Sequence, residues 1–187
     1  MTAGGAGTTT HGRGGQAMTT DVRAGHDAPA GFAATLRAPF ALLGVRTDAR
    51  AVTGLAYLPD GHAETAPAGA IAERAVREIE RYLDDPAFPF TVPLAPRGTP
   101  FQRRVWDAIR AIPLRESRTY GEVARAVRSA PRAVGQACGA NRIALIIPCH
   151  RVVGSRGALG GFMNADAGDP LAIKRWLLRH EGYRFGA

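Results

Sequence analysis

The stretch Pro148-Cys149-His150-Arg151 places a thiol beside an imidazole, the two groups that a cysteine nucleophile requires. The thiolate is the reactive form of cysteine, and a nearby histidine lowers the pKa of the thiol. Pro148 holds Ile147 extended, which predicts that a strand ends here and presents Cys149 at a bend. Side chains alternate faces on an extended chain, so contact between Cys149 and His150 needs that bend or a water molecule. A single cysteine is more often a small core residue, and spacing alone leaves both interpretations open.

The cysteine content restricts the remaining chemistry. The chain of 187 residues contains two cysteines, which excludes a disulfide-rich secreted scaffold and a four-thiolate zinc site. One bridge between Cys138 and Cys149 stays formally possible. No apolar run reaches the length of about 18–20 residues that a membrane span needs, and the N-terminus lacks a signal-peptide core. We expect a soluble cytoplasmic protein with no metal, no cofactor and no membrane partner.

The elements before the cysteine read as a helix, a helix-turn-helix and a buried strand. Thr99-Pro100 is typical of a helix N-terminus, and the apolar face of that helix begins at Phe101. Two further helices are predicted at 120–127 and 132–140, joined by a short turn that ends in Pro131. An apolar run at 143–147 predicts the strand that leads to the cysteine.

The second of these two helices is poor in groups that read base edges. Only Arg132 and Gln136 are long and polar within 132–140, and the rest of the helix is small. This composition favours groove binding with little sequence preference. The alternative is a helix packed tightly inside the protein, with Gly and Ala chosen for close approach.

The first half of the chain offers structure without obvious chemistry. Residues 1–30 are rich in Gly, Thr and Ala and predict a disordered tail. Residues 31–95 predict a small α+β domain with a structural or partner role, and 95–98 a linker. Its expected elements are a hairpin of strands at 40–45 and 52–58, a helix at 71–83 and an edge strand at 88–92.

The formal net charge of +8 is carried by the second half of the chain. Residues 1–98 contain 9 arginines and 10 acidic residues, whereas residues 99–187 contain 14 arginines and one lysine against 6 acidic residues. A basic half indicates a polyanionic partner, most often nucleic acid. An arginine-rich genome composition explains the choice of Arg over Lys, but it does not explain this asymmetry.

The motif Pro148–Val152 resembles the active-site signature of the O6-alkylguanine-DNA alkyltransferases. The similarity extends, in the family's order, over residues 98–182. Its other matching segments are Gly98–Trp106, Thr119–Gly121, Arg132–Gly135, Asn141 and Lys174–Glu181. The resemblance implies an α+β fold, in which a small ribonuclease-H-like α/β domain precedes a mainly helical domain, residues 98–187, with the helix-turn-helix and the reactive cysteine.

The resemblance also implies single-turnover DNA repair. O6-alkylguanine, and possibly O4-alkylthymine, would be flipped out of duplex DNA bound through the minor groove, and its alkyl group would pass irreversibly to Cys149. His150 would act as base through a water, Glu181 would orient His150, Asn141 would brace the turn, and Tyr120 would donate its hydroxyl to guanine. The implied DNA-binding residues are Thr99, Arg132 (as the finger that fills the vacated stack), Ala133, Gly135 and Gln136. The implied pocket residues are Tyr120, Val152, Gly160, Gly161, Phe162 and Met163.

Several alternatives stay open. The alternative for Tyr120 is a core aromatic with its hydroxyl at the surface, and the alternative for Glu181 is a surface pair with Arg179 or Arg184; the resemblance favours the functional interpretation of both. We expect Cys138 to be a packed small residue and not a second nucleophile. Two other functions remain possible for the whole chain. One is a lesion-binding protein or helix-turn-helix regulator without chemistry, and the other is a Cys-His hydrolase. It departs from the family at Leu114-Arg115, where a glycine is common, in a shortened turn at 128–131 and in a longer loop at 164–169. We expect a monomer that is cytoplasmic and, as in bacteria, associated with the nucleoid, with cooperativity on DNA left open.

Overall fold

The structure is a computed structural model that describes residues 1, 31–59, 61–162 and 170–184. The predicted tail, apart from Met1, and the 164–169 loop therefore lie outside the described residues. Helices and strands both contribute, as expected. In chain order the main elements are β1 Ala34–Ala38, β2 Ala41–Thr47, β3 Val52–Leu58, α1 Ala70–Asp84, α2 Pro100–Arg110, β4 Arg118–Thr119, α3 Tyr120–Ala126, α4 Pro131–Gly139, a 3-10 turn η1 Cys149–Arg151, β5 Val152–Val153, a 3-10 turn η2 Ser155–Gly157 and α5 Pro170–His180.

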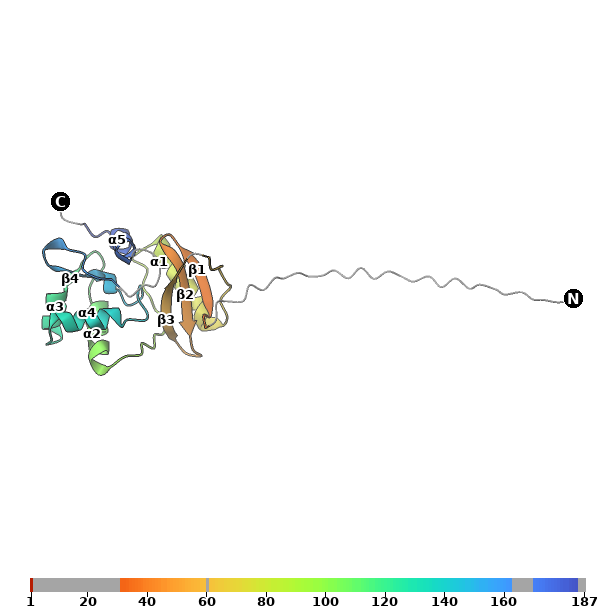
Figure 1. Cartoon of the computed structure of the whole chain (residues 1–187), viewed down its shortest axis with the longest axis horizontal. Coiled ribbons are helices and arrows are strands. Elements are labelled where there is room, and N and C mark those ends of the chain that lie inside the picture. The colour runs from red at the N-terminus through yellow and green to blue at the C-terminus, as the bar shows by residue number, and fades with distance from the viewer. Residues whose placement is uncertain (2–30, 60, 163–169, 185–187) are drawn as a thin grey trace.

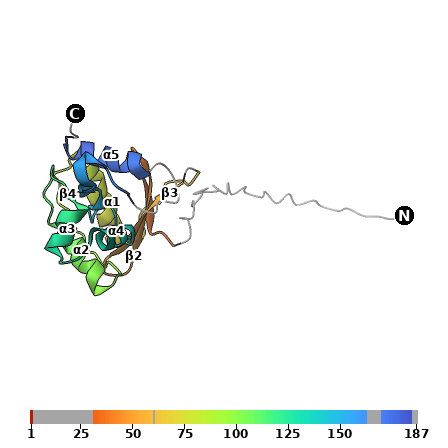
Figure 2. The ribbon, with the colours of Figure 1, turned by 60° about the vertical axis from the view of Figure 1, so that its left-hand side comes forward.

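The predicted hairpin is confirmed as β2 and β3, and the sheet contains a third strand that the sequence analysis missed. The order is β1-β2-β3, all antiparallel, with Leu36 opposite Leu43 and Leu43 opposite Tyr57. The predicted helix is also confirmed as α1, which buries Ala72, Ala75 and Ile79 against the sheet. Figure 2 shows α1 running alongside the strands.

The predicted edge strand at 88–92 is wrong. The backbone N–H groups of Thr91 and Val92 both donate to the carboxylate of Glu78 on α1, at 2.8 Å each, so they are not available to a strand partner. Pairing with the sheet begins two residues later, where Leu94 forms a bridge with Val52.

The three helices predicted in the second half are confirmed as α2, α3 and α4, and the first two begin at a capping box. Thr99 and Thr119 each close a capping box at the start of α2 and α3, with Gln102 and Glu122 as the reciprocal partners. The indole of Trp106 on α2 donates to the carbonyl of Ala137 on α4 at 2.8 Å, which ties the first helix to the helix-turn-helix. Figure 1 shows α2, α3 and α4 gathered at the end of the molecule away from the β1–β3 sheet.

The predicted strand at 143–147 is also wrong, because the segment turns back on itself. The backbone N–H of Ile147 donates to the carbonyl of Ile143 at 3.0 Å, and Leu145 adopts a left-handed φ of 89°. All five residues are nevertheless buried. A continuous apolar run reports burial correctly but does not distinguish a buried strand from a buried turn.

One hydrophobic cluster connects the two halves of the chain. It joins Leu43 and Ile79 from the first half with Trp106, Ile143 and Leu177 from the second. The division into domains at 31–95 and 98–187 stays a prediction, as does the ribonuclease-H-like description of the first part. The site described below lies where these two parts of the core meet.

Candidate active site

Cys149 begins the 3-10 turn η1 and is almost completely buried, with 4 % of its surface exposed. Its backbone N–H donates to the carbonyl of Ile147 at 2.8 Å, which closes the chain reversal that starts at Ile143. Its sulfur accepts a hydrogen bond from the side-chain amide of Asn141, with Nδ2 and Sγ 2.9 Å apart. The thiol is therefore held at a fixed point by the turn and by one directed donor.

Asn141 connects α4 to this turn through three hydrogen bonds. Its Nδ2 donates to the carbonyl of Ile147 at 3.0 Å as well as to the Cys149 sulfur, and its Oδ1 accepts from the backbone N–H of Ile143 at 3.0 Å. The side chain therefore forms hydrogen bonds with the backbone at both ends of the turn. A bracing role for Asn141 is compatible with this position.

His150 is fully buried and lies against Glu181, which follows directly after α5. Nε2 of His150 and Oε1 of Glu181 are 2.9 Å apart. Burial lowers the pKa of His150, although Glu181 opposes the shift, so the imidazole is neutral at neutral pH. The Glu181 carboxylate only accepts hydrogen bonds, so Nε2 carries the proton and Nδ1 keeps a free lone pair. Nδ1 has no hydrogen-bond partner within the part of the chain that the structure describes.

Glu181 is 2 % exposed, which excludes the surface pairing with Arg179 or Arg184 considered from sequence. Burial opposes its ionisation, but hydrogen bonds from His150 and Arg151 lower its pKa to about 2. Arg151 donates to both carboxylate oxygens, Nε to Oε2 at 2.7 Å and Nη2 to Oε1 at 2.9 Å. Tyr82 of α1 donates its hydroxyl to Oε1 at 2.9 Å.

Two of these partners were missed by the sequence analysis. Arg151 lies inside the quoted motif but was given no role, and the first half of the chain was expected to contribute no chemistry. Tyr82 nevertheless connects the first half to the site, since it reaches Glu181 across 99 residues of sequence. The sequence contains no signal for such a contact, because Tyr82 occupies an ordinary core position of an amphipathic helix.

Lys174 of α5 is a third residue without a predicted role. It is fully buried and donates through Nζ to three backbone carbonyls, those of Val152 at 2.6 Å, Leu159 at 2.5 Å and Gly161 at 3.1 Å. Burial lowers its pKa to about 8, although the two cysteines oppose the shift. Lys174 thus holds the segment 152–161 in place and brings a positive charge near both thiols.

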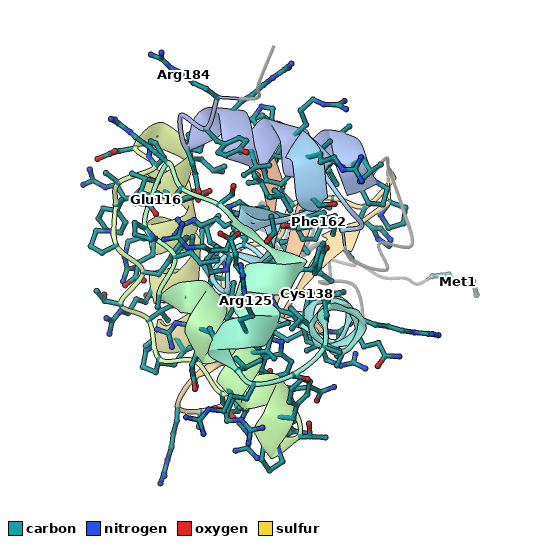
Figure 3. All side chains as sticks on the ribbon, turned by 90° about the vertical axis from the view of Figure 1, so that its left-hand side faces the viewer. Met1, Glu116, Arg125, Cys138, Phe162 and Arg184 are labelled. Carbon is teal, nitrogen blue, oxygen red and sulfur yellow. The ribbon has the colours of Figure 1, made fainter. Side chains whose placement is uncertain are left out.

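A cavity of about 940 Å³ opens beside the thiols, between α3, α4 and the 160–162 segment. Its lining includes Tyr120, Arg132, Gly135, Gln136, Cys138, Gly161 and Phe162. Figure 3 looks onto this side of the molecule and labels Cys138 and Phe162. Cys149 does not belong to this lining, whereas Cys138 does.

The glycines of α4 keep one face of that helix open. A Cβ added at Gly139 would meet nothing within 4 Å, and one at Gly135 would come no closer than 3.9 Å to Tyr120. Close packing inside the protein therefore does not explain these glycines. Together with the exposed side chains of Arg132 and Gln136, they form an accessible small-residue face beside the cavity.

Tyr120 lies half-buried at the cavity wall, and its hydroxyl donates to the carbonyl of Gly161 at 2.9 Å. Burial raises its pKa to about 12, so it remains a donor at neutral pH. Gly160 has a left-handed φ of 67°, and a Cβ there would lie 2.7 Å from the Tyr120 ring. Only glycine allows the wall segment to approach Tyr120 this closely.

The other predicted residues lie farther from this centre. Val152 is buried and offers its carbonyl to Lys174, Thr99 caps α2, and Ala133 is half-buried on α4 without lining the cavity. Met163 lies outside the described residues.

Within the described ranges, no group of three or more His, Cys, Asp or Glu side chains is placed to hold a metal, and no helix is long and apolar enough to cross a membrane.

Comparison with known proteins identifies the relatives of this chain. The family model described as the DNA-binding domain of 6-O-methylguanine DNA methyltransferase matches residues 100–183. The crystal structure of Mycobacterium tuberculosis O6-methylguanine methyltransferase is similar at a TM-score of 0.68 and 38 % sequence identity, over 79 % of this chain and 90 % of that one. This chain belongs to the O6-methylguanine-DNA methyltransferase family.

Two sequence relatives are named methylated-DNA–protein-cysteine methyltransferases. A methylated-DNA–protein-cysteine methyltransferase of Methanosarcina acetivorans is 46 % identical over 110 residues, which span 58 % of this chain and 67 % of that protein. One from Salmonella typhimurium is 48 % identical over 95 residues, which span 50 % of this chain and 53 % of that protein. A further crystal structure shows the M. tuberculosis family member in complex with DNA, at a TM-score of 0.67 and 37 % identity.

Proposed function

We propose that this protein repairs duplex DNA by transferring an alkyl group from O6 of guanine to Cys149. One observation carries the proposal, the arrangement of Cys149 and the residue that follows it, His150. Asn141 donates to the buried Cys149 sulfur. His150 is neutral, its Nε2 is fixed by ionised Glu181, and its Nδ1, which has no partner among the described residues, can accept a proton. This is the arrangement of an activated cysteine nucleophile. The family relationship supplies the substrate class.

The reaction balances as a single displacement. Cys149 loses its proton to Nδ1 of His150, directly or through a water, and Glu181 stabilises the imidazolium that forms. The thiolate sulfur attacks the alkyl carbon, a C–S bond forms, and the bond between that carbon and guanine O6 breaks. The guanine leaves with the bonding pair and takes up one proton, which restores His150. The thioether is chemically stable, so each molecule reacts once.

The cavity wall supports the departure of guanine. The hydroxyl of Tyr120 points to the carbonyl of Gly161 at the edge of the cavity and stays protonated at neutral pH. In the complex we assign this donor to the base, where it stabilises the negative charge that develops on the leaving purine. Lys174 keeps the opposing wall in position through the three carbonyls of 152–161.

The helix-turn-helix is the DNA-binding element of this proposal. The small-residue face of α4 allows close approach to a minor groove, and Arg132 and Gly135 both line the cavity. A flipped guanine enters the cavity, and the Arg132 guanidinium takes its place in the base stack. We propose that the protein does this as a monomer.

Mass spectrometry tests the proposal directly. The protein is mixed with a duplex that contains one O6-methylguanine, and its intact mass and peptide masses are recorded. We expect one added methyl group, located on Cys149, and restored guanine in the DNA. Cys149→Ala should bind the duplex and gain no mass, while Cys138→Ala should still be methylated.

Each rival function predicts a different result in the same experiment. Tight binding of the modified duplex with no change in protein mass would contradict transfer and leave a lesion-binding protein. Catalytic turnover of an ester or amide with no stable thioether would indicate a Cys-His hydrolase.

A further inference from the structure

The inner end of the cavity is marked by Phe162. Among the lining residues that the structure describes, Phe162 and Cys138 are the buried ones, with 8 % and 7 % of their surfaces exposed. Lys174 holds the chain just before Phe162 through the carbonyls of Leu159 and Gly161. The Phe162 side chain has no polar group, so packing alone fixes the position of its ring. The groups that pack behind this ring therefore decide how much room the inner end of the cavity offers.

One of these groups is Tyr57 of β3, from the first half of the chain. Its ring centroid lies 6.4 Å from that of Phe162, and the two ring planes are nearly perpendicular, at 84°. This edge-to-face arrangement is a favourable contact between aromatic rings. Tyr57 is buried, with 6 % of its surface exposed, and it does not line the cavity. Its ring therefore stands behind Phe162 and not beside it.

Tyr57 is itself supported by a row of rings that ends on α5. The rings of Tyr57 and Phe40 are 5.9 Å apart, and those of Phe40 and Trp176 of α5 are 4.8 Å apart. A closely packed interior of this kind leaves no space into which a ring can shift. The Tyr57 hydroxyl is buried and has no hydrogen-bond partner among the residues that the structure describes. The ring, and not the hydroxyl, is thus the part of Tyr57 that holds Phe162 in place.

We propose that Tyr57 is a positioning residue that limits the size of the transferred alkyl group, because its ring prevents Phe162 from retreating from the inner end of the cavity. This inference rests on the proposed function, in which the alkylated guanine enters the cavity and its alkyl group points toward the enclosed Cys149. The preferred substrates are then O6-alkylguanines with small alkyl groups such as methyl. A bulky group such as benzyl requires displacement of the Phe162 ring.

A comparison of two alkyl groups in the same DNA tests this role. Single-turnover transfer is measured from duplexes of one sequence that carry either O6-methylguanine or O6-benzylguanine, so that only the alkyl group differs. In Tyr57→Leu the space behind Phe162 opens, and the ratio of the benzyl rate to the methyl rate should rise about tenfold, as expected for a small change in apolar pocket volume. Tyr57→Phe keeps the ring and should keep the wild-type ratio. An unchanged ratio in Tyr57→Leu, or an equal rise in Tyr57→Phe, would overturn the inference.

Two further variants separate this role from a general loss of stability. Leu36→Ala removes a buried side chain from β1, in register with Leu43 of β2, which in turn lies opposite Tyr57. It should lower the melting temperature and leave the ratio unchanged, and an equal rise in the ratio would contradict a specific role for Tyr57. If Tyr57→Leu does not fold, Tyr57→Met fills the space with a flexible side chain and should shift the ratio in the same direction. A wild-type protein that transfers neither group would refute the proposed function instead.

Discussion

The two sides of Cys149 are built in opposite ways. Behind it, His150 and Glu181 are buried, and the carboxylate is bound by groups from two distant parts of the chain, Arg151 and Tyr82. In front of it, a cavity of about 940 Å³ is lined by glycines and by the exposed Arg132. The side chains behind Cys149 are buried and already held in place by hydrogen bonds. Stabilising charge in a transition state requires such a preorganised, water-excluded environment. The front is left open, which suits the function proposed above, in which a base enters the cavity from DNA.

This difference predicts how variants on each side should affect the rate of transfer. Changes at the rear, or at a cavity group that contacts the leaving guanine such as Tyr120, should slow the chemistry on every substrate, whereas changes to the DNA-facing Arg132 should matter mainly for substrates that arrive in DNA. The following predictions are ordered by the size of the expected effect on transfer or stability.

Glu181→Gln should produce the largest loss, about a hundredfold in the rate of transfer. The amide removes the negative charge that stabilises the imidazolium of His150 and leaves Arg151 without its bidentate partner. Single-turnover transfer from the methylated duplex measures the effect. Tyr82→Phe is the matched control, since it removes one hydrogen bond to Glu181 and keeps the carboxylate. A loss as large in Tyr82→Phe as in Glu181→Gln would mean that packing, and not charge, is responsible.

Tyr120→Phe should slow transfer by about ten- to a hundredfold, the effect of removing one hydrogen bond to a charged group. The ring that fills the space above Gly160 is kept, so the fold should be unchanged. The rate should fall for both the duplex and the free base, because both produce the same leaving guanine. Equal rates in variant and wild type would place the hydroxyl in a purely structural contact with Gly161.

Acid stability tests the rear network by itself. Burial holds the pKa of His150 below its ordinary value of 6.5, so the unfolded chain takes up that proton first and stability falls as pH drops below about 6.5. Glu181, with a pKa of about 2 against an ordinary 4.5, adds a further loss between these values. The melting temperature of wild type should therefore decrease in two stages. In Glu181→Gln it should be lower at neutral pH, and the second stage should be smaller but still present, because the pKa values of Asp48, Glu78 and Glu122 are also lowered. A second stage of the same size in Glu181→Gln and wild type would contradict this contribution of Glu181.

Part of the site could be predicted from the sequence. The Thr99-Pro100 pair predicted the start of α2 through local capping chemistry. The family resemblance supplied Arg132 and Gly135 of α4 and Glu181 behind the cysteine. The motif likewise brought Cys149, His150 and Asn141 to attention.

The rear depends on contacts that no local pattern encodes. Tyr82 looks like any buried residue of an amphipathic helix, and Lys174 looks like a solvated charge on α5, yet one binds Glu181 and the other binds three carbonyls. The two strand predictions are wrong for the same physical reason. At 143–147 and 88–92 the backbone N–H groups are satisfied by a turn and by Glu78, which are tertiary solutions that β-propensity does not detect.

The division between a chemical rear and a DNA-facing front is tested most directly by one ratio, the transfer rate from duplex DNA divided by the rate from free O6-benzylguanine. It is measured in wild type, Arg132→Ala and Glu181→Gln. In the proposed function Arg132 assists base extrusion only, so Arg132→Ala should lower the ratio about tenfold. Glu181→Gln should leave the ratio unchanged while lowering both rates. Equal losses on both substrates in Arg132→Ala, or a ratio altered by Glu181→Gln, would contradict the account.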